Sequence, residues 1–324
     1  MKLAFLFPGQ GAQAVGMGRV LAERFPEAQE TFDQADRALG YPLSSICWEG
    51  PAEELKRSIH TQPALLTHSV AAWRLVGRAG LQASWVAGHS LGEYSACVAA
   101  GALEFVDALQ LVHRRGELMY QAGLERPGAM AAILGLEREA VEAVCEEASA
   151  AGLVRAANLN GPGQVVISGE IPAVDQACER ARERGAKRAV RLEVSGAFHS
   201  PLMASAAQGL GEALDRVAIR SARCPVVVNV SATPLQGAEE LRAALKAQLL
   251  SAVRWEDSMR FLLDRGATGF VELGTGTVLR GLLRALDRKV PSFSIGDPAT
   301  LHEALGALNA ASSVSEAPVA GREP

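Results

Sequence analysis

A Gly-His-Ser-Leu-Gly pentapeptide at residues 88–92 constrains the fold of this chain more than any other stretch. It follows a short apolar run at residues 84–87, which is typical of a buried strand. Glycines on both sides of Ser90 allow a sharp turn from a strand into a helix. Such a turn exposes the serine hydroxyl at the edge of a sheet and aims the N–H of Leu91 at an oxyanion. The pattern predicts a nucleophilic serine, and a serine that only caps a helix is the alternative.

Strand-like and helix-like stretches alternate along much of the chain. This alternation predicts an α/β fold, a hydrolase-like large domain with a mostly parallel sheet. The expected strands lie at residues 2–8, 84–90, 224–230 and 268–274, and the expected helical stretches at 16–39, 65–80 and 104–123.

Residues 128–195 follow a different order, strand, helix, strand, strand, helix, strand. That order is typical of a ferredoxin-like small lobe. We therefore predict a large domain formed by residues 1–127 and 196–308, with residues 128–195 inserted as a small subdomain. The last residues, 311–324, are small, polar and punctuated by proline, and we expect a disordered tail or a linker there.

Composition limits the possible partners and compartment. The chain has 324 residues, a formal net charge of −4 and an isoelectric point near 5.9. This balance argues against nucleic acid or an anionic membrane as a partner. The five cysteines are scattered and form no Cys-x-x-Cys pair, so we expect a reducing, cytoplasmic environment and no metal site. No apolar run is long enough to span a membrane, and the N-terminal run is too short for a signal peptide.

A nucleophilic serine needs a base, and the chain has six histidines. His89 adjoins the serine, so its side chain in an extended strand points to the opposite face. His199 lies where the small lobe ends and a helix begins, with Ser200 as the expected N-cap and Pro201 as the first helical residue. This position suits a catalytic base. A capping or merely exposed histidine is the alternative.

An arginine interrupts an apolar helical stripe. In the helix expected at residues 104–123, Arg115 shares one face with Leu111, Leu118 and Ala122, whereas Arg114 lies among polar neighbours. A buried guanidinium must find an anion or cost several kcal/mol, ~3 or more. Its partner is either an internal carboxylate or the carboxylate of a substrate held in a bidentate manner.

Two further patterns carry less information. Residues 9–14, Gly-Gln-Gly-Ala-Gln-Ala, match the glycine pattern of a dinucleotide site, but the helical sequence that follows provides no second strand with an acidic end, so we reject that function. Residues 179–191, "ERARERGAKRAVR", hold six basic and two acidic side chains. Such a run is usually a solvated surface, and docking of an acidic partner through Arg182 and Arg188 is the functional alternative.

Taken together, the motifs of residues 1 to about 305 resemble the malonyl-CoA:acyl carrier protein transacylase family, which includes the acyltransferases of fatty acid and polyketide synthases. The resemblance implies a hydrolase-like α/β core with a ferredoxin-like insertion. Eight motifs in the same order are far more specific than any one of them. They are "FPGQGAQ", "TQPALL", "GHSLGEY", "HRRGELM", "NGPGQVVISG", "GAFHS", "VRW" and "VELGTGTVL".

The resemblance also implies a reaction and its residues. A malonyl group would pass from malonyl-CoA through a malonyl-serine to the phosphopantetheine thiol of an acyl carrier protein, without a cofactor. The implied catalytic pair is Ser90 and His199, a dyad in which a backbone carbonyl near Gln248 orients the histidine. The implied oxyanion hole is formed by the N–H groups of Gln10 and Leu91, and the implied substrate-binding residues are Arg115 for the malonyl carboxylate, Phe198 for the choice of malonyl over methylmalonyl, and Asn160 and Gln62 near the site.

Three other functions would use parts of the same pattern. An acyl hydrolase on the same fold would release the acyl group to water, but it has no use for a buried cation such as Arg115. An ordinary esterase would place its acid between the serine and the histidine, where much of the chain is the inserted lobe. A catalytically silent carrier-binding module would not need Ser90, His199 and Arg115 together. We therefore expect a transferase.

Overall fold

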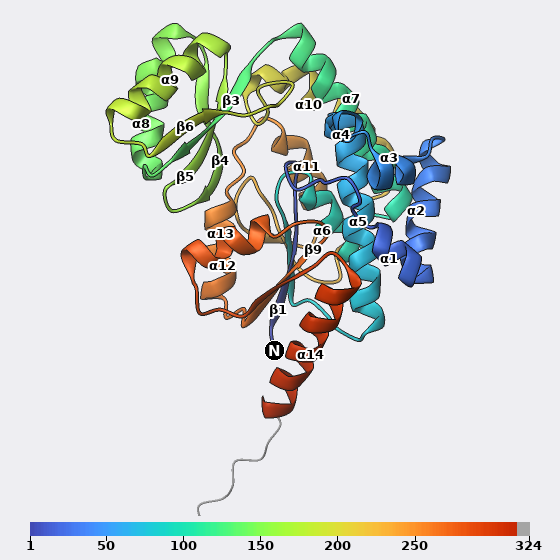
Figure 1. Cartoon of the computed structure of the whole chain (residues 1–324). Helices are drawn as coiled ribbons and strands as arrows, with labels where there is room; N and C mark the ends of the chain where they lie inside the picture. Colours follow the sequence, from blue (N-terminus) through green and yellow to red (C-terminus); the bar gives the residue numbers. More distant parts are fainter. Residues whose placement is uncertain (316–324) are drawn as a thin grey trace, which may run out of the picture.

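The structure is a computed structural model, and it describes residues 1–315 of the chain. A six-stranded sheet forms the centre, in the order β10-β9-β1-β2-β7-β8 (Figure 1). Every pairing from β10 to β7 is parallel, and only β8 pairs antiparallel. The strands are β1 (Leu3–Phe7), β2 (Trp85–Gly88), β7 (Val226–Val227), β8 (Pro234–Leu235), β9 (Gly269–Leu273) and β10 (Ser292–Ile295).

Helices cover both faces of this sheet, as a parallel sheet requires. In β1, Leu3, Phe5 and Phe7 belong to the larger hydrophobic cluster, whereas Ala4 and Leu6 belong to a second cluster with α12 and α13. This alternation is the two-residue period of a strand buried on both sides. The helices of this part are α1 (Arg19–Arg24), α2 (Pro26–Leu39), α3 (Leu43–Glu49), α4 (Ala52–Lys56), α5 (Ser58–Arg78), α6 (Gly92–Ala99), α7 (Phe105–Glu125), η2 (Pro201–Met203), α10 (Ala204–Arg216), α11 (Ala238–Gln248), α12 (Trp255–Asp264), α13 (Val278–Leu286) and α14 (Pro298–Ser315).

The second sheet has four strands in the order β4-β5-β3-β6, and all of its pairings are antiparallel. Its elements follow the order strand, helix, strand, strand, helix, strand along the chain, which confirms the ferredoxin-like lobe. In Figure 1 this lobe lies at the upper left, beside the central sheet. Its elements are β3 (Ala129–Leu134), α8 (Arg138–Ala148), η1 (Ser149–Ala151), β4 (Val154–Gly161), β5 (Gln164–Gly169), α9 (Ile171–Glu183) and β6 (Arg188–Arg191).

Several elements differ in length from their sequence predictions. The helix predicted over residues 16–39 is divided into α1 and α2, because Phe25 is extended in front of Pro26. The strand predicted over 224–230 is paired in the sheet only at Val226–Val227, and the last strand predicted for the small lobe is paired only at Arg188–Arg191. Helix α14 is rich in alanine and leucine and continues to Ser315, five residues into the segment predicted as a tail. Residues 316–324 of that segment lie outside the described part of the chain.

No helix within residues 1–315 is both long enough and apolar enough to cross a membrane.

Candidate active site

The turn after β2 places Ser90 at the carboxyl edge of the central sheet. Ser90 has a φ of 49°, in the left-handed region that favours glycine, and α6 begins two residues later. A Cβ on Gly88 would lie 1.9 Å from the carbonyl carbon of Gly92, and a Cβ on Gly92 would lie 2.0 Å from the carbonyl oxygen of Phe7. Only glycine therefore fits on either side of the serine. A strained, close-packed turn of this kind is typical of a nucleophile.

Asn229 holds this turn from the neighbouring strand. It follows β7 in the chain, and its Oδ1 accepts the backbone N–H of Ser90 at 2.7 Å. Its Nδ2 donates to the carbonyl of Gly88 at 2.7 Å. The N–H of Asn229 in turn donates to Glu93, whose buried carboxyl has its pKa raised to about 7 by desolvation. Sequence reasoning missed Asn229; a polar residue just after a strand that lies beside the serine's strand is the signal that could have found it.

His199 lies within hydrogen-bonding distance of the serine. Oγ of Ser90 is 2.8 Å from Nε2 of His199. Nδ1 of His199 is 3.1 Å from the carbonyl oxygens of Gln248 and Ser251, which can only accept. Nδ1 therefore carries the hydrogen, and the lone pair of Nε2 faces the serine. Burial, followed by the charge of Arg115, lowers the pKa of His199 to about 3, so the ring is neutral.

The chain just after His199 has the capping predicted from the sequence. The Ser200 side chain accepts the N–H of Leu202, and Pro201 opens η2, which leads into α10. His199 itself has a φ of 58°. A left-handed residue followed directly by a capped turn fixes the imidazole at one place beside the serine.

Arg115 is fully buried and forms no salt bridge within residues 1–315, and the buried Glu93 acts on its charge only from a longer distance. Its Nη2 donates to Oγ of Ser90 and to Oε1 of Gln248, both at 3.0 Å. Its Nη1 donates to Oε1 of Gln62 at 2.9 Å, and its Nε has no hydrogen-bond partner among the described residues. The adjacent Arg114 has a side chain 53% exposed and pairs with Glu117. A buried cation held by neutral groups can bind a carboxylate from a substrate.

Two glutamines extend this network to the loop after β1. Nε2 of Gln62 lies 3.3 Å from Oε1 of Gln10, and Nε2 of Gln10 donates to Ser58 at 3.1 Å. The side chain of Gln248 also donates to the carbonyl of Ser90 at 2.9 Å. The resemblance implies only that a carbonyl near Gln248 accepts a hydrogen bond from His199. The contacts of the Gln248 side chain are not predicted from the sequence.

The backbone N–H groups of Leu91 and Gln10 have no acceptor within the described residues. Leu91 directly follows the serine, and Gln10 lies in the loop that follows β1, the strand next to β2 in the sheet. Unpaired N–H groups beside a nucleophile are what an oxyanion hole requires.

Asn160 and Phe198 occupy different places around the site. Oδ1 of Asn160 is 2.8 Å from Nε2 of His89, and the His89 ring lies 5.5 Å from that of Trp255. Asn160 thus contacts the second histidine and not the Ser90–His199 pair. Phe198 lines a cavity of about 540 Å³ together with Gln10. The cavity is bounded by the loop after β1, the α4–α5 junction, α7 and the segment before His199.

Within residues 1–315, no group of three or more His, Cys, Asp or Glu side chains is arranged to hold a metal ion. The chemistry visible at the site is a serine with a neutral imidazole, a buried guanidinium and two free N–H donors. Such an arrangement can transfer an acyl group that carries a carboxylate.

Comparison with known proteins agrees with this chemistry. A family described as an acyl transferase domain matches residues 4–316. A curated relative, malonyl CoA-acyl carrier protein transacylase of Bacillus subtilis, is 48% identical over 95% of this chain and 97% of its own. The solved malonyl CoA-acyl carrier protein transacylase of Coxiella burnetii superposes with a TM-score of 0.92 at 40% identity, over 94% of this chain and 97% of that one. A malonyl-transacylase solved in complex with its type II PKS acyl-carrier protein also gives a TM-score of 0.92, at 42% identity over 95% of this chain and 100% of that chain.

Proposed function

This chain belongs to the malonyl CoA-acyl carrier protein transacylase family of acyl transferases, and we propose that Ser90, His199 and Arg115 carry out its reaction. The enzyme transfers a malonyl group from malonyl-CoA to an acyl carrier protein, for fatty acid or polyketide synthesis. The observation that supports these residue roles most strongly is the fully buried Arg115, which lies 3.0 Å from Oγ of Ser90 and pairs with no internal carboxylate among residues 1–315.

In the first half-reaction, Ser90 attacks the thioester carbonyl of malonyl-CoA. Its hydroxyl proton passes to Nε2 of His199, 2.8 Å away. The negative charge that develops on the carbonyl oxygen is stabilised by the N–H groups of Leu91 and Gln10. Collapse of the tetrahedral intermediate breaks the C–S bond, and the protonated His199 returns its proton to the departing CoA thiolate.

In the second half-reaction, the phosphopantetheine thiol of the carrier takes the place of CoA. His199 accepts the thiol proton as the sulfur attacks the malonyl-serine ester, and the same two N–H groups stabilise the oxyanion. The imidazolium then protonates Oγ of Ser90 as the C–O bond breaks. The enzyme returns to its starting protonation state, so no cofactor is consumed.

Arg115 holds the malonyl carboxylate during both steps. Before substrate binds, its guanidinium is satisfied only by neutral oxygens from Ser90, Gln248 and Gln62 among the described residues. A carboxylate offers it a charge-assisted, bidentate partner in a buried site. An acetyl group offers none, and this difference favours the dicarboxylic thioester by about 2–5 kcal/mol.

The cavity lined by Phe198 and Gln10 lies next to the site, and its lining does not include Ser90, His199 or Arg115 themselves. It has a volume of about 540 Å³, and Leu192, Val194 and Tyr120 give it apolar walls. We infer that CoA and the carrier's phosphopantetheine reach Ser90 through it in turn. Asn160 acts through its bond to His89, and Gln62 acts by orienting Arg115.

Intact-protein mass spectrometry after brief mixing with malonyl-CoA or acetyl-CoA, followed by a holo carrier protein, tests this proposal. We expect a malonyl adduct that is absent in Ser90→Ala, weak with acetyl-CoA, and passed to the carrier. An adduct that is lost to water with carrier present would indicate an acyl hydrolase. The absence of any adduct would contradict the proposed roles and favour a binding module.

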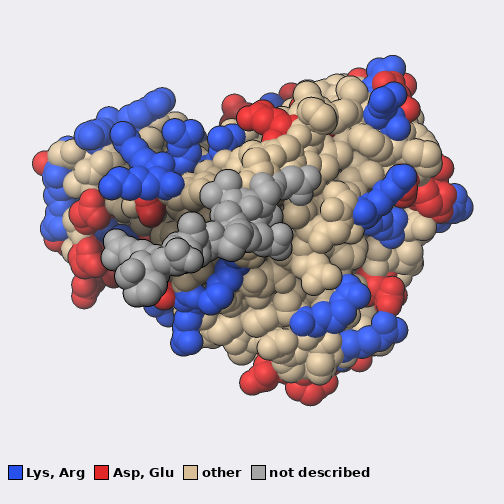
Figure 2. All heavy atoms as spheres, turned by 90° about the horizontal axis from the view of Figure 1, so that it is seen from below, with Lys and Arg blue, Asp and Glu red and all other residues tan. Residues whose placement is uncertain are grey.

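Three further assignments are also proposals. The division into a large domain of residues 1–127 and 196–308 and a small subdomain of 128–195 is supported by the separate hydrophobic cluster between β3, β5, α8 and α9. A cytoplasmic location is supported by the five scattered free cysteines. Seen from below, Lys and Arg gather on the side where Figure 1 places α8, α9, α12 and α13 (Figure 2), which supports carrier docking on that side.

The basic run itself is a weaker docking candidate than its composition indicates. Arg180 and Arg184 both pair with Glu147, and Arg191 pairs with Asp175. The other three basic side chains, Arg182, Lys187 and Arg188, form no ion pair within residues 1–315, and the docking prediction concerns Arg182 and Arg188. Charge reversal at both positions is expected to raise the KM for the carrier without changing that for malonyl-CoA, and an unchanged carrier KM would exclude this surface.

A further inference from the structure

The stretch 248–254 connects the small lobe to the proposed base. At its beginning, the carbonyls of Gln248 and Ser251 receive Nδ1 of His199. Near its end, the N–H of Val253 donates to the carbonyl of Ala157 at 2.8 Å, and the N–H of Leu159 donates to the carbonyl of Val253 at 2.9 Å. Strand β4 of the lobe is therefore hydrogen-bonded to the same stretch that orients the imidazole.

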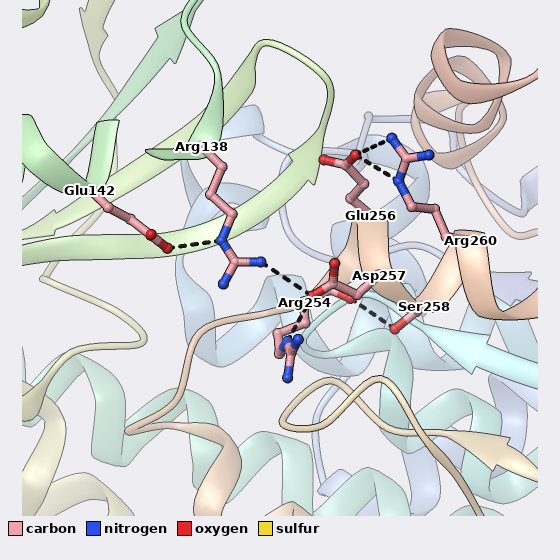
Figure 3. Close-up of polar contacts among 7 residues, drawn as sticks. All are labelled: Arg138, Glu142, Arg254, Glu256, Asp257, Ser258 and Arg260. Carbon is pink, nitrogen blue, oxygen red and sulfur yellow. Dashed lines mark hydrogen bonds and ion pairs between the residues drawn. The ribbon is translucent and has the colours of Figure 1, made fainter. Parts of the chain in front are cut away.

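An ion triad fastens the end of this stretch. Asp257, in the first turn of α12, accepts from Nε of Arg254 at 2.7 Å and from Nη1 of Arg138 at 3.3 Å, both through Oδ2 (Figure 3). Arg138 begins α8 of the small lobe and also pairs with Glu142 at 2.8 Å. One carboxylate thus connects a lobe helix to the residue that follows Val253.

The backbone of Arg254 contacts both the serine turn and α12. Its N–H donates to the carbonyl of Asn229 at 3.0 Å, and its carbonyl accepts Oγ of Ser258 at 2.9 Å (Figure 3). Asn229 is the residue that accepts the N–H of Ser90. Arg254 is therefore held from the lobe, from α12 and from the serine turn together.

We propose that Asp257 is a positioning residue for His199, acting by fixing the stretch 248–254 between the small lobe and the central sheet. The proposal rests on the proposed function of His199 as the base. At 3.1 Å, the two carbonyls hold the Nδ1 hydrogen near the long end of ordinary hydrogen bonds, so a small displacement of the stretch weakens both. The neutral imidazole is then no longer held in one tautomer or in the orientation that directs Nε2 toward Ser90.

Helix α12 supplies a matched control. Glu256 precedes Asp257 and pairs with Arg260 one turn later on the same helix, and within residues 1–315 it forms no ion pair with the lobe (Figure 3). Asp257→Asn and Glu256→Gln each remove one negative charge from the first turn of α12 and break an ion pair. Only Asp257→Asn removes the carboxylate that joins Arg138 of the lobe to Arg254. A general effect of charge at the helix N-terminus is the same in both variants and therefore does not contribute to the difference between them.

The test combines a rate with a measurement that does not depend on chemistry. Asp257→Asn is expected to slow Ser90 acylation by about five-fold, the upper end for a partly exposed ion pair, at unchanged KM for malonyl-CoA. Hydrogen exchange of the Val253 and Leu159 amides, followed by mass spectrometry on peptides spanning 154–161 and 248–254, is expected to accelerate. Glu256→Gln is expected to leave both unchanged. Arg138→Gln, made from the lobe side, is expected to reproduce the exchange pattern.

Three results would overturn the inference. The first is that the Asp257→Asn and Glu256→Gln enzymes are acylated at equal rates. The second is that the Asp257→Asn enzyme is acylated more slowly while hydrogen exchange at 154–161 and 248–254 is unchanged. The third is that the Asp257→Asn protein does not fold, while the Arg138→Gln protein folds and shows the hydrogen exchange of the wild type. A wild-type enzyme that forms no malonyl-serine would instead contradict the proposed function, and the exchange data would still decide whether Asp257 holds the stretch.

Discussion

Nη2 of Arg115 donates a hydrogen bond to Oγ of Ser90 over 3.0 Å, so the proposed anion-binding group and the proposed nucleophile are direct neighbours. A guanidinium stays protonated and cannot accept the serine proton, so we assign that task to His199, whose Nε2 also lies within hydrogen-bonding distance of the hydroxyl. The short distance also suits a malonyl group, in which a single methylene separates the carboxylate from the thioester carbonyl. In the proposed mechanism, the group that selects the substrate and the group that attacks it therefore lie within one hydrogen-bond length of each other.

Replacing Arg115 with alanine is expected to remove the preference for malonyl. Acylation by malonyl-CoA should fall on the order of 100-fold or more, because a buried carboxylate without a partner is strongly disfavoured. Acylation by acetyl-CoA should change far less. Brief-mixing mass spectrometry with both thioesters measures the two rates. Arg114→Ala, on the exposed side of the same helix, is the control and should keep the preference for malonyl. If Arg115→Ala slowed acylation by malonyl-CoA and by acetyl-CoA in equal proportion, a carboxylate-binding role for Arg115 would be contradicted.

The fold could be predicted where a local pattern decides the structure. The apolar runs that became β1, β2 and β9, and the order of elements in the small lobe, are properties of neighbouring residues in the chain. The break at Phe25 could have been predicted in the same way, since the residue before a proline avoids the helical region. The burial of Arg115 followed from its position in an apolar helical stripe.

Other parts of the site depend on which elements pack together, and no local pattern reports that. Asn229 reaches Ser90 only because β7 lies next to β2 in the sheet. The side chain of Gln248 reaches Arg115 and the carbonyl of Ser90 because α11 ends beside the serine turn. Asn160 meets His89 across 71 residues of chain. These contacts are set by tertiary packing between distant segments.

With Glu93 replaced by glutamine, so that the buried carboxyl with a pKa of about 7 no longer titrates, the acylation rate is expected to remain flat as the pH falls from 8 to 5. The base must be unprotonated, and burial together with Arg115 lowers the pKa of His199 to about 3, so the ring is protonated only well below pH 5. A histidine with the ordinary pKa near 6.5 would lose most of its base form over the same range. Rapid-quench acylation across this range, with circular dichroism confirming the fold at each pH, measures it.

A decline of the acylation rate centred near pH 6.5 that is present in Glu93→Gln would contradict this assignment. His199→Ala is the companion variant, and it should slow acylation by about 10²–10⁴-fold, the usual contribution of a general base. The exposed His302 provides the matched histidine control, and His302→Ala should acylate like wild type.

Asn229→Ala is expected to destabilise the protein and slow acylation together. It leaves the N–H of Ser90 and the carbonyl of Gly88 without their partners, at a cost of roughly 1–3 kcal/mol for each buried group. Urea unfolding and the acylation rate measure the two effects. Ser231→Ala, two residues further along, is the control, because the Ser231 hydroxyl forms an exposed hydrogen bond with Thr233. Equal stability of the two variants would show that Asn229 does not hold the turn.

Gly92→Ala is expected to destabilise the protein by about 3 kcal/mol or more, because its Cβ would lie 2.0 Å from the backbone carbonyl oxygen of Phe7 and neither segment is free to move. Gly77→Ala is the control: this glycine lies inside α5 with no atom within 4 Å of the added Cβ, and alanine there should stabilise by about 0.5–1 kcal/mol. Thermal unfolding of both variants measures the difference. A Gly92→Ala protein as stable as wild type would mean that the turn is not close-packed against β1.

Phe198→Ala is expected to relax the choice between malonyl and methylmalonyl. Phe198 is 6% exposed, lines the cavity with Gln10 and precedes the proposed base, so we expect its ring to limit the space beside the thioester. Discrimination against one methyl group is typically about 10–200-fold, and removing the ring should reduce it by roughly ten-fold. Competition between malonyl-CoA and methylmalonyl-CoA for Ser90, read by mass spectrometry, gives the ratio directly.

Tyr120→Ala is the control for Phe198→Ala, because Tyr120 lines the same cavity but is 46% exposed. An unchanged ratio in Phe198→Ala, or an equal change in Tyr120→Ala, would move the origin of selectivity away from Phe198.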